Sequence, residues 1–253
     1  MDFFSYFCSK NYGMDYGIKQ ELEPILYSGN KNRSFKLVWD ILYYTRLLKY
    51  VHRQQYKEIR SRLSLAATRK GLSHLCKLGY LKEVKLNIFC STDKAISLLK
   101  DISYITPKGC GLDLLPSEAT GKGELNEMNN TRVFLEALSL DDFYALLYPN
   151  FEYLKPDALL VRKKERHYKL TFLEIEEPKP QWHDYIEQKR DNYLRLAKDI
   201  NFYNYWKNTC GSLHFPVPDI LSVKFSVCFV GNIRKDFGTG FTFTSKLEHE
   251  RSE

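Results

Sequence analysis

The sequence lacks a long apolar run, a signal peptide and a phosphate-binding loop. No stretch of about 18 or more apolar residues is present, and the first seven residues do not have the charged and then apolar layout of a secretion signal. We therefore expect neither membrane spanning nor secretion, and we expect a cytoplasmic location. The short glycine motifs Gly121–Gly123 and Gly238–Gly240 do not have the spacing of a phosphate-binding loop, so we expect no nucleotide cofactor.

Paired cysteine motifs are also absent. The six cysteines have no C-x-x-C spacing and no histidine at the offsets that a zinc site requires, which excludes a zinc ribbon and a disulfide scaffold as working hypotheses. We interpret them as reduced thiols. The six histidines do not group and no G-x-S-x-G motif occurs, so the sequence offers no nucleophile triad.

What the chain has is basic charge concentrated in one region. Residues 46–100 contain 13 Lys and Arg against three acidic residues, a net charge of +10, whereas the whole chain has a net charge of +7. A basic region of this kind is typical of a nucleic-acid contact surface. A solvated lysine-rich surface without a ligand is the alternative.

The same region has the pattern of three helices followed by a β-hairpin. Apolar residues recur at helical spacing over 34–50, 53–63 and 66–78; Gly79 then ends the third helix, and 80–89 alternates as two strands do. This order predicts a winged helix-turn-helix, in which the third helix enters the DNA major groove and the hairpin contacts phosphates. A small protein-docking module is the alternative.

Docking of this kind predicts which side chains contact DNA. Base reading is expected from the third helix, and the phosphate contacts are expected to be basic side chains on the helices and the hairpin. A two-fold symmetric DNA site would in addition require a homodimer. The predicted base-reading residues are Thr68, Arg69, Ser73 and Lys77, and the predicted phosphate contacts are Arg53, Lys57, Arg60, Arg69, Lys70 and Lys85.

The densest cluster of glycine and proline separates this region from a second domain. We predict an N-terminal arm (1–34), a winged helix domain (35–105), a linker (106–126) and an α/β domain with a mixed sheet (127–253), an α+β organisation overall. In the second domain the expected helices cover 131–140, 141–147 and 182–200, and the expected strands cover 158–161, 168–176 and 221–230.

Acidic residues on the expected strands form the candidate site. Glu174 and Glu176 alternate with apolar neighbours and therefore share one face, and a hairpin of this length brings Asp157 near Glu174. Three converging carboxylates require a hard cation such as Mg²⁺ or Mn²⁺. Lys189 lies on the packing stripe of the following helix, where the carboxylates would be its partner. An open sheet with solvent-facing glutamates and a lysine that extends to the rim is the alternative.

This order of residues resembles the PD-(D/E)XK nuclease core, and its pairing with a winged helix is similar to the replication-relaxation family of plasmid and mobile-element proteins. The resemblance implies that Asp157 and Glu174 ligate the divalent metal with help from the Ile175 carbonyl, and that a lysine orients or activates the attacking water. It also implies an additional acid at Glu136. The sequence departs from the pattern at Glu176, where the family has lysine, and Lys189 is the candidate replacement.

The leading hypothesis is a DNA-binding protein of a mobile element that nicks or cleaves DNA with a metal ion. A non-catalytic replication initiator or accessory factor, with the second domain as an inactive nuclease relic, is the alternative. A third hypothesis is transesterification through a tyrosine. Tyr193 is the tyrosine nearest the carboxylates, although it lies on the packing stripe.

Overall fold

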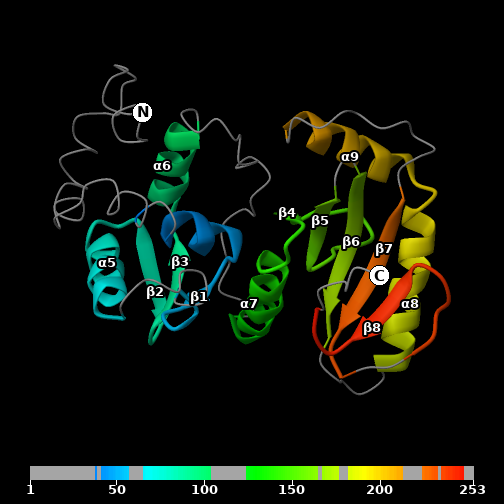
Figure 1. The fold of residues 1–253 in the computed structure, drawn as a ribbon, viewed down its shortest axis with the longest axis horizontal. Coiled ribbons are helices and arrows are strands. Elements are labelled where there is room, and N and C mark those ends of the chain that lie inside the picture. Colours follow the sequence, from blue (N-terminus) through cyan, green and yellow to red (C-terminus); the bar gives the residue numbers. More distant parts are fainter. Residues whose placement is uncertain are drawn as a thin grey trace. The chain divides into compact units, whose positions relative to one another are not determined.

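The structure is a computed structural model that describes residues 38, 41–56, 65–103, 124–164, 167–176, 182–212, 224–232 and 235–247. The chain divides into two compact units (Figure 1). The N-terminal unit comprises Met1–Leu112 and Pro116–Met128, and the C-terminal unit comprises Asp113–Leu115 and Asn129–Glu253. Helices and two separate sheets make the protein a mixed α/β structure, as predicted. Within the described ranges, no helix has the length and apolar character needed to cross a bilayer.

The N-terminal unit combines helices with a small antiparallel sheet of order β1-β3-β2. Buried residues from the helices and the sheet form its core, among them Leu42, Leu72 and Leu98. Residues 41–47 are helical. The later elements are β1 (Val51–His52), α5 (Leu65–Lys77), β2 (Leu81–Lys85), β3 (Ile88–Ser91) and α6 (Asp93–Ser103).

Gly79 ends α5 as predicted. It has a φ of 76°, a left-handed conformation that glycine adopts without steric cost. The Tyr80 N–H donates to the Leu75 carbonyl at 2.9 Å, and the Gly79 N–H donates to the Cys76 carbonyl at 3.0 Å. This pair of bonds is a Schellman motif, which satisfies the last carbonyls of the helix and directs the chain into β2.

This unit differs in some details from the sequence prediction. The first helix ends at residue 47 rather than at 50, because Lys49 has a left-handed φ of 63° and the chain then enters β1. The predicted 53–63 helix begins with a turn at 53–54 and is helical at 55–56, and its remainder lies outside the described residues. The prediction also did not include α6, which Thr92 caps through its side-chain oxygen.

The C-terminal unit is built on a five-stranded sheet of order β4-β5-β6-β7-β8 (Figure 1). The pairs β4–β5 and β5–β6 are antiparallel, and the pairs β6–β7 and β7–β8 are parallel. The elements in chain order are α7 (Glu124–Leu138), β4 (Phe143–Leu147), β5 (Ala158–Lys164), β6 (His167–Ile175), α8 (Trp182–Leu196), α9 (Ile200–Ser212), β7 (Phe225–Val230) and β8 (Phe241–Thr244). The helix α7 begins inside the N-terminal unit and ends inside this one.

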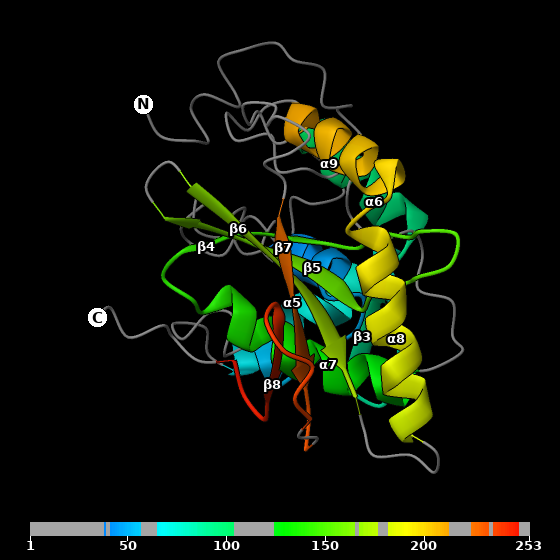
Figure 2. The ribbon, with the colours of Figure 1, turned by 90° about the vertical axis from the view of Figure 1, so that its right-hand side faces the viewer.

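Helices α8 and α9 lie against one face of the sheet (Figure 2), and buried residues of both helices and of the strands form one hydrophobic cluster. Ile186 and Tyr193 from α8 and Phe202 from α9 pack with Phe172 of β6 and Phe229 of β7. Phe172 has ring contacts with both helices, at 5.2 Å to Tyr193 and 5.8 Å to Phe202. Burial of these side chains is the main favourable term that fixes α8 against the sheet.

Three predictions for this unit are wrong. Residues 143–147 form strand β4 rather than a helix, because Ala145 and Leu147 pair with Val161 and Leu159 of β5. The single helix expected over 182–200 is two helices, since α8 ends at Leu196 and α9 starts at Ile200, which is 53% exposed. The helix expected over 131–140 starts earlier, since α7 covers Glu124–Leu138. The strand β8 and most of α9 were not predicted.

The buried thiols provide a test of this packing. Cys90, Cys210 and Cys228 are buried, and Cys76 is half-buried. Burial raises the pKa of the Cys210 thiol to about 11, and only the thiolate reacts with alkylating agents. We expect iodoacetamide at pH 8 to modify Cys210 roughly 100-fold more slowly in the native protein than in urea. Peptide mass spectrometry measures both rates, and equal rates would contradict the packing of α9.

Candidate active site in the C-terminal unit

The candidate site lies at the edge of the sheet where β6 ends and β5 begins. The register pairs Ala158 with Leu173, so Asp157 and Glu174 are the next opposing pair along the hairpin. Directly opposed residues of antiparallel strands have their side chains on the same face. The prediction that the hairpin brings Asp157 beside Glu174 is therefore confirmed by the register.

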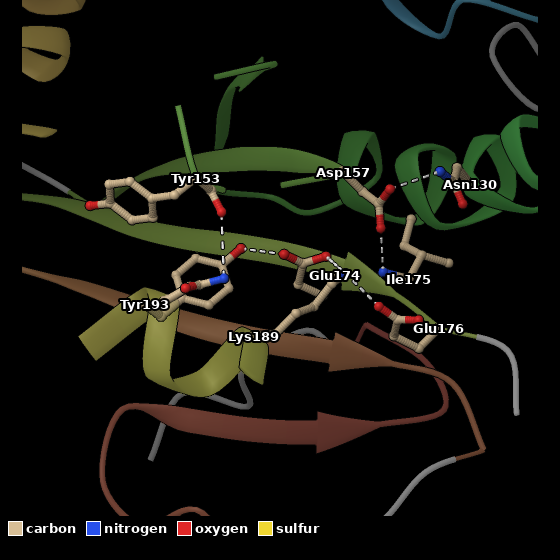
Figure 3. A network of polar contacts seen from close by, with 9 residues as sticks. Asn130, Tyr153, Asp157, Glu174, Ile175, Glu176, Lys189 and Tyr193 are labelled. Carbon is tan, nitrogen blue, oxygen red and sulfur yellow. Dashed lines mark hydrogen bonds and ion pairs between the residues drawn. The ribbon is translucent and has the colours of Figure 1, made fainter. Parts of the chain in front are cut away.

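Lys189 of α8 lies between the two glutamates (Figure 3). Its Nζ donates hydrogen bonds to Glu174 Oε2 and to Glu176 Oε1, the latter at 2.5 Å. Glu174 is fully buried, Glu176 is 5% exposed and the Lys189 side chain is 14% exposed. The sequence prediction that Glu174 and Glu176 share a face and that Lys189 finds its partner there is confirmed.

Tyr193 completes this network from the next turn of α8. Its hydroxyl donates a hydrogen bond of 2.5 Å to Glu174 Oε1, while its ring packs in the core. Burial, reinforced by the negative charge of Glu174, raises the pKa of Tyr193 well above its usual value. Tyr193 is therefore a packing residue, as its place on the apolar face of α8 predicted. It is also a hydrogen-bond donor to Glu174.

The charges of the network depend on one another. Burial raises the pKa of the Glu174 carboxyl to about 7 against the opposing effect of Lys189, and the charge of Asp157 adds to the rise. Burial by itself lowers the pKa of Lys189, but Glu174 and Glu176 outweigh that effect and hold it above its ordinary value. The ammonium group therefore stays charged, and it supplies the positive charge that two buried carboxylates require.

Asp157 is oriented by the backbone of β6 and by α7. Its Oδ2 accepts the Ile175 N–H at 2.7 Å, and its Oδ1 accepts a long hydrogen bond of 3.4 Å from the Asn130 amide (Figure 3). The Ile175 N–H lies between the two glutamates along the strand, so this bond fixes Asp157 at the site. Sequence reasoning missed Asn130, because an asparagine in a helix gives no signal for a contact with a distant strand.

Gly231 limits the space beside Glu176, and sequence reasoning also missed it. A Cβ atom added to Gly231 would lie 2.2 Å from the Glu176 carbonyl oxygen. The Glu176 N–H donates to the Val230 carbonyl at 3.0 Å, and the Gly231 N–H donates to Thr244 at 2.8 Å. A glycine directly after a buried strand is the available sequence signal for such a close backbone approach.

Glu136 has its contacts elsewhere. Its Oε1 is 3.5 Å from Arg132 one turn earlier in α7, and its Oε2 accepts the Leu247 N–H at 3.2 Å. Both carboxylate oxygens of Glu136 therefore contact residues outside the Lys189 network. These contacts do not join Glu136, the additional acid that the resemblance implies, to the Lys189 network.

The oxygen donors of Asp157 and Glu174 are of the kind that Mg²⁺ prefers. In the part of the chain that the structure describes, no group of three or more His, Cys, Asp or Glu side chains is arranged to hold a metal ion. Mg²⁺, however, is commonly held by one or two carboxylates together with water and substrate phosphates. Asp157 and Glu174 supply two carboxylates, but both oxygens of Glu174 already accept hydrogen bonds, from Lys189 and from Tyr193, and Glu176 also pairs with Lys189.

The candidate DNA contacts of the N-terminal unit lie largely on one side of α5. Arg69, Lys70, Ser73 and Lys77 are exposed there, and Lys85 is exposed on β2. Thr68 is the exception, because it is fully buried and its hydroxyl does not reach a base. Arg53 is half-buried, and Lys57 and Arg60 lie outside the described residues.

Comparison of the chain with protein families, with curated proteins and with solved structures finds no match.

Proposed function

We propose that the protein binds DNA through its N-terminal unit and hydrolyses a phosphodiester with a divalent metal at the Asp157–Glu174 edge of its C-terminal unit. The observation that carries this proposal is the position of Lys189 between Glu174 and Glu176, with Asp157 opposite Glu174. The resemblance to PD-(D/E)XK nucleases implies this combination of two acids and a lysine. The similarity to the replication-relaxation family implies a role in the replication or mobilisation of a mobile element.

The N-terminal unit supports the DNA-binding part of the proposal. A helix, the strand β1, the helix α5 and the β2–β3 hairpin follow one another, and the hairpin packs beside β1 in a three-stranded sheet. In a winged helix, α5 would be the recognition helix and the hairpin the wing. The exposed Arg69, Lys70 and Lys77 have the charge that DNA phosphates require.

The residues of the C-terminal unit have separate tasks in this proposal. Asp157 and Glu174 would hold Mg²⁺, which lowers the pKa of a bound water and screens the phosphate charge. The ammonium group of Lys189 would lie near the metal-bound phosphate, where it would stabilise negative charge on the phosphoryl oxygens. Glu176 and Tyr193 fix Lys189 and Glu174 in place through their hydrogen bonds.

One observation favours the non-catalytic alternative. Glu174 has no exposed surface, and Lys189 already neutralises it, so a cation reaches Glu174 only when the lysine side chain moves aside. A buried ion network with this arrangement also serves as a purely structural element in a DNA-binding initiator or accessory factor. A nicking assay separates the catalytic function from the non-catalytic one.

The test is metal-dependent nicking of supercoiled plasmid by Asp157→Asn and by wild type. Asp157 is half-buried at the end of the sheet. Asparagine has nearly the same size as aspartate and keeps one acceptor oxygen. We expect nicking to fall by at least about 100-fold, the scale of lost electrostatic stabilisation of a reacting group, while DNA binding is unchanged. Equal nicking by the variant, or none by wild type with Mg²⁺ or Mn²⁺, would leave the non-catalytic function. Asp184→Asn, an exposed acid on α8, is the matched control.

A further inference from the structure

An exposed aromatic ring lies next to Lys189 at the candidate site. Tyr185 is one turn before Lys189 in α8, and the Lys189 ammonium lies over its ring, 4.9 Å from the ring centroid. A cation and an aromatic face at this distance attract each other. Tyr185 is nevertheless 40% exposed, so part of its side chain still faces solvent beside this contact.

The ring lies where the buried ion network comes closest to solvent on α8. Glu174 is fully buried and Glu176 is 5% exposed, whereas the Lys189 side chain is 14% exposed. A ligand that approaches these three groups from solvent therefore meets Lys189 first. The ring of Tyr185 is in contact with that same ammonium group, so the ligand meets the ring as well.

The ring and the carboxylates are separated by a distance that one nucleotide spans. The Lys189 Nζ is 2.5 Å from Glu176 Oε1, so the Tyr185 ring centroid is at most about 7.4 Å from that oxygen, the sum of 2.5 and 4.9 Å. The base and the phosphate of one nucleotide are separated by a similar length. A phosphate beside Lys189 thus leaves its base within reach of the ring.

The core of the unit does not account for an aromatic residue at this position. Among the described residues, the hydrophobic cluster under α8 includes Ile186 and Tyr193 but not Tyr185. Leucine and methionine also favour a helix more strongly than tyrosine does. Aromatic rings beside cationic groups are typical of sites that hold unpaired nucleotides, because the base stacks on the ring while the phosphate contacts the cation.

We infer that Tyr185 stacks on the base of the nucleotide beside the reacting phosphate, and that the substrate is therefore single-stranded or locally unpaired DNA. Inside a duplex both faces of a base are covered by its neighbours, so a side chain stacks only on a base that has left the stack. Every base has a π-face, so this contact does not select a sequence. The inference rests on the proposed function for the presence of DNA at this site.

Photocrosslinking tests the contact directly. The full chain is irradiated with a thymidine single strand of about 20 nucleotides that carries 5-iododeoxyuridine, a base that crosslinks to aromatic side chains in contact with it. Peptide mass spectrometry should place a crosslink at Tyr185. Tyr144, which is 39% exposed on β4, is the matched control and should not react. No crosslink at Tyr185, or equal crosslinking of both tyrosines, would overturn the inference.

Cleavage kinetics separate stacking from mere support of Lys189. Wild type should cut a single strand faster than the matched duplex. Tyr185→Ala should reduce this preference about tenfold in kcat/KM, the scale of one lost stacking contact, whereas Tyr185→Phe and Tyr144→Ala should stay within about twofold of wild type. Equal losses on strand and duplex would assign the ring to holding Lys189 and would overturn the inference.

Failure of this inference and failure of the proposed function give different results. The crosslink reports contact and does not require catalysis. A crosslink at Tyr185 without nicking by wild type would remove the proposed catalysis and keep the stacking contact. Nicking that depends on Asp157, without a crosslink at Tyr185, would keep the catalysis and overturn the stacking contact.

Discussion

Replacing Lys189 by methionine is expected to destabilise the C-terminal unit by about 3–5 kcal/mol, the cost of leaving buried charge without its partner. Glu174 is fully buried and Glu176 is 5% exposed, and Lys189 donates hydrogen bonds to both. Methionine keeps the length of the side chain but removes the ammonium group. Urea unfolding at neutral pH measures the loss.

The loss should depend on pH in a defined direction. Without Lys189 the two carboxylates keep the burial that raises the pKa of Glu174 and lose the cation that lowers it. A group whose pKa is higher in the folded state binds its proton preferentially there, so its stabilising contribution is present at low pH and decreases as pH rises through the folded pKa. The deficit of Lys189→Met relative to wild type should therefore be smaller at pH 5 than at pH 8.

Two further variants make this test specific. Lys198→Met removes an exposed lysine near the end of α8 and should have wild-type stability. Adding Glu176→Gln to Lys189→Met should recover part of the loss, because one of the two unpaired charges is removed. Wild-type stability of Lys189→Met at pH 8 would contradict the buried ion network.

Gly231→Ala should have the second large effect. The new methyl group would lie 2.2 Å from the Glu176 carbonyl oxygen, a backbone atom that cannot rotate away. The ends of β6 and β7 must then separate, which strains the 3.0 Å bond from the Glu176 N–H to Val230 and shifts Glu176 relative to Lys189. We expect a loss of about 3 kcal/mol in unfolding free energy, at the upper end for overpacking.

Gly211→Ala is the matched control for this substitution. Gly211 is in α9, and a Cβ atom there would meet nothing within 4 Å. Alanine in a helix is better than glycine by up to about 1 kcal/mol, so this variant should be as stable as wild type or more stable. If both glycine variants unfold at the same urea concentration, the close approach of Gly231 to Glu176 is wrong.

The elements that sequence reasoning found are those with a strong local signal. The end of α5 was predicted because Gly79 follows a clear helical stripe, and β6 was predicted from its alternation of apolar and polar residues. Residues 143–147 have no such signal. Their character as β4 depends on pairing with β5, a contact with a partner that is more than ten residues away in the sequence.

The same distinction applies to the candidate site. Glu174 and Glu176 had to share a face because a strand alternates with a period of two, and Lys189 needed a partner because it lies on an apolar stripe. The contacts of Asn130 with Asp157 and of Glu136 with Leu247 join distant segments. No spacing rule within one element predicts contacts of that kind.

The sequence by itself determined the concentration of basic charge in residues 46–100, the glycine stop after the third helix and the choice of two glutamates and a lysine as a coupled set. These follow from composition and from the periods of helix and strand. Only the tertiary structure decided that Thr68 is buried, that Lys189 contacts both glutamates at once and that Glu136 contacts Leu247. The physical reason is that burial and strand register are set by the pairing of segments distant in sequence, which local periodicity does not specify.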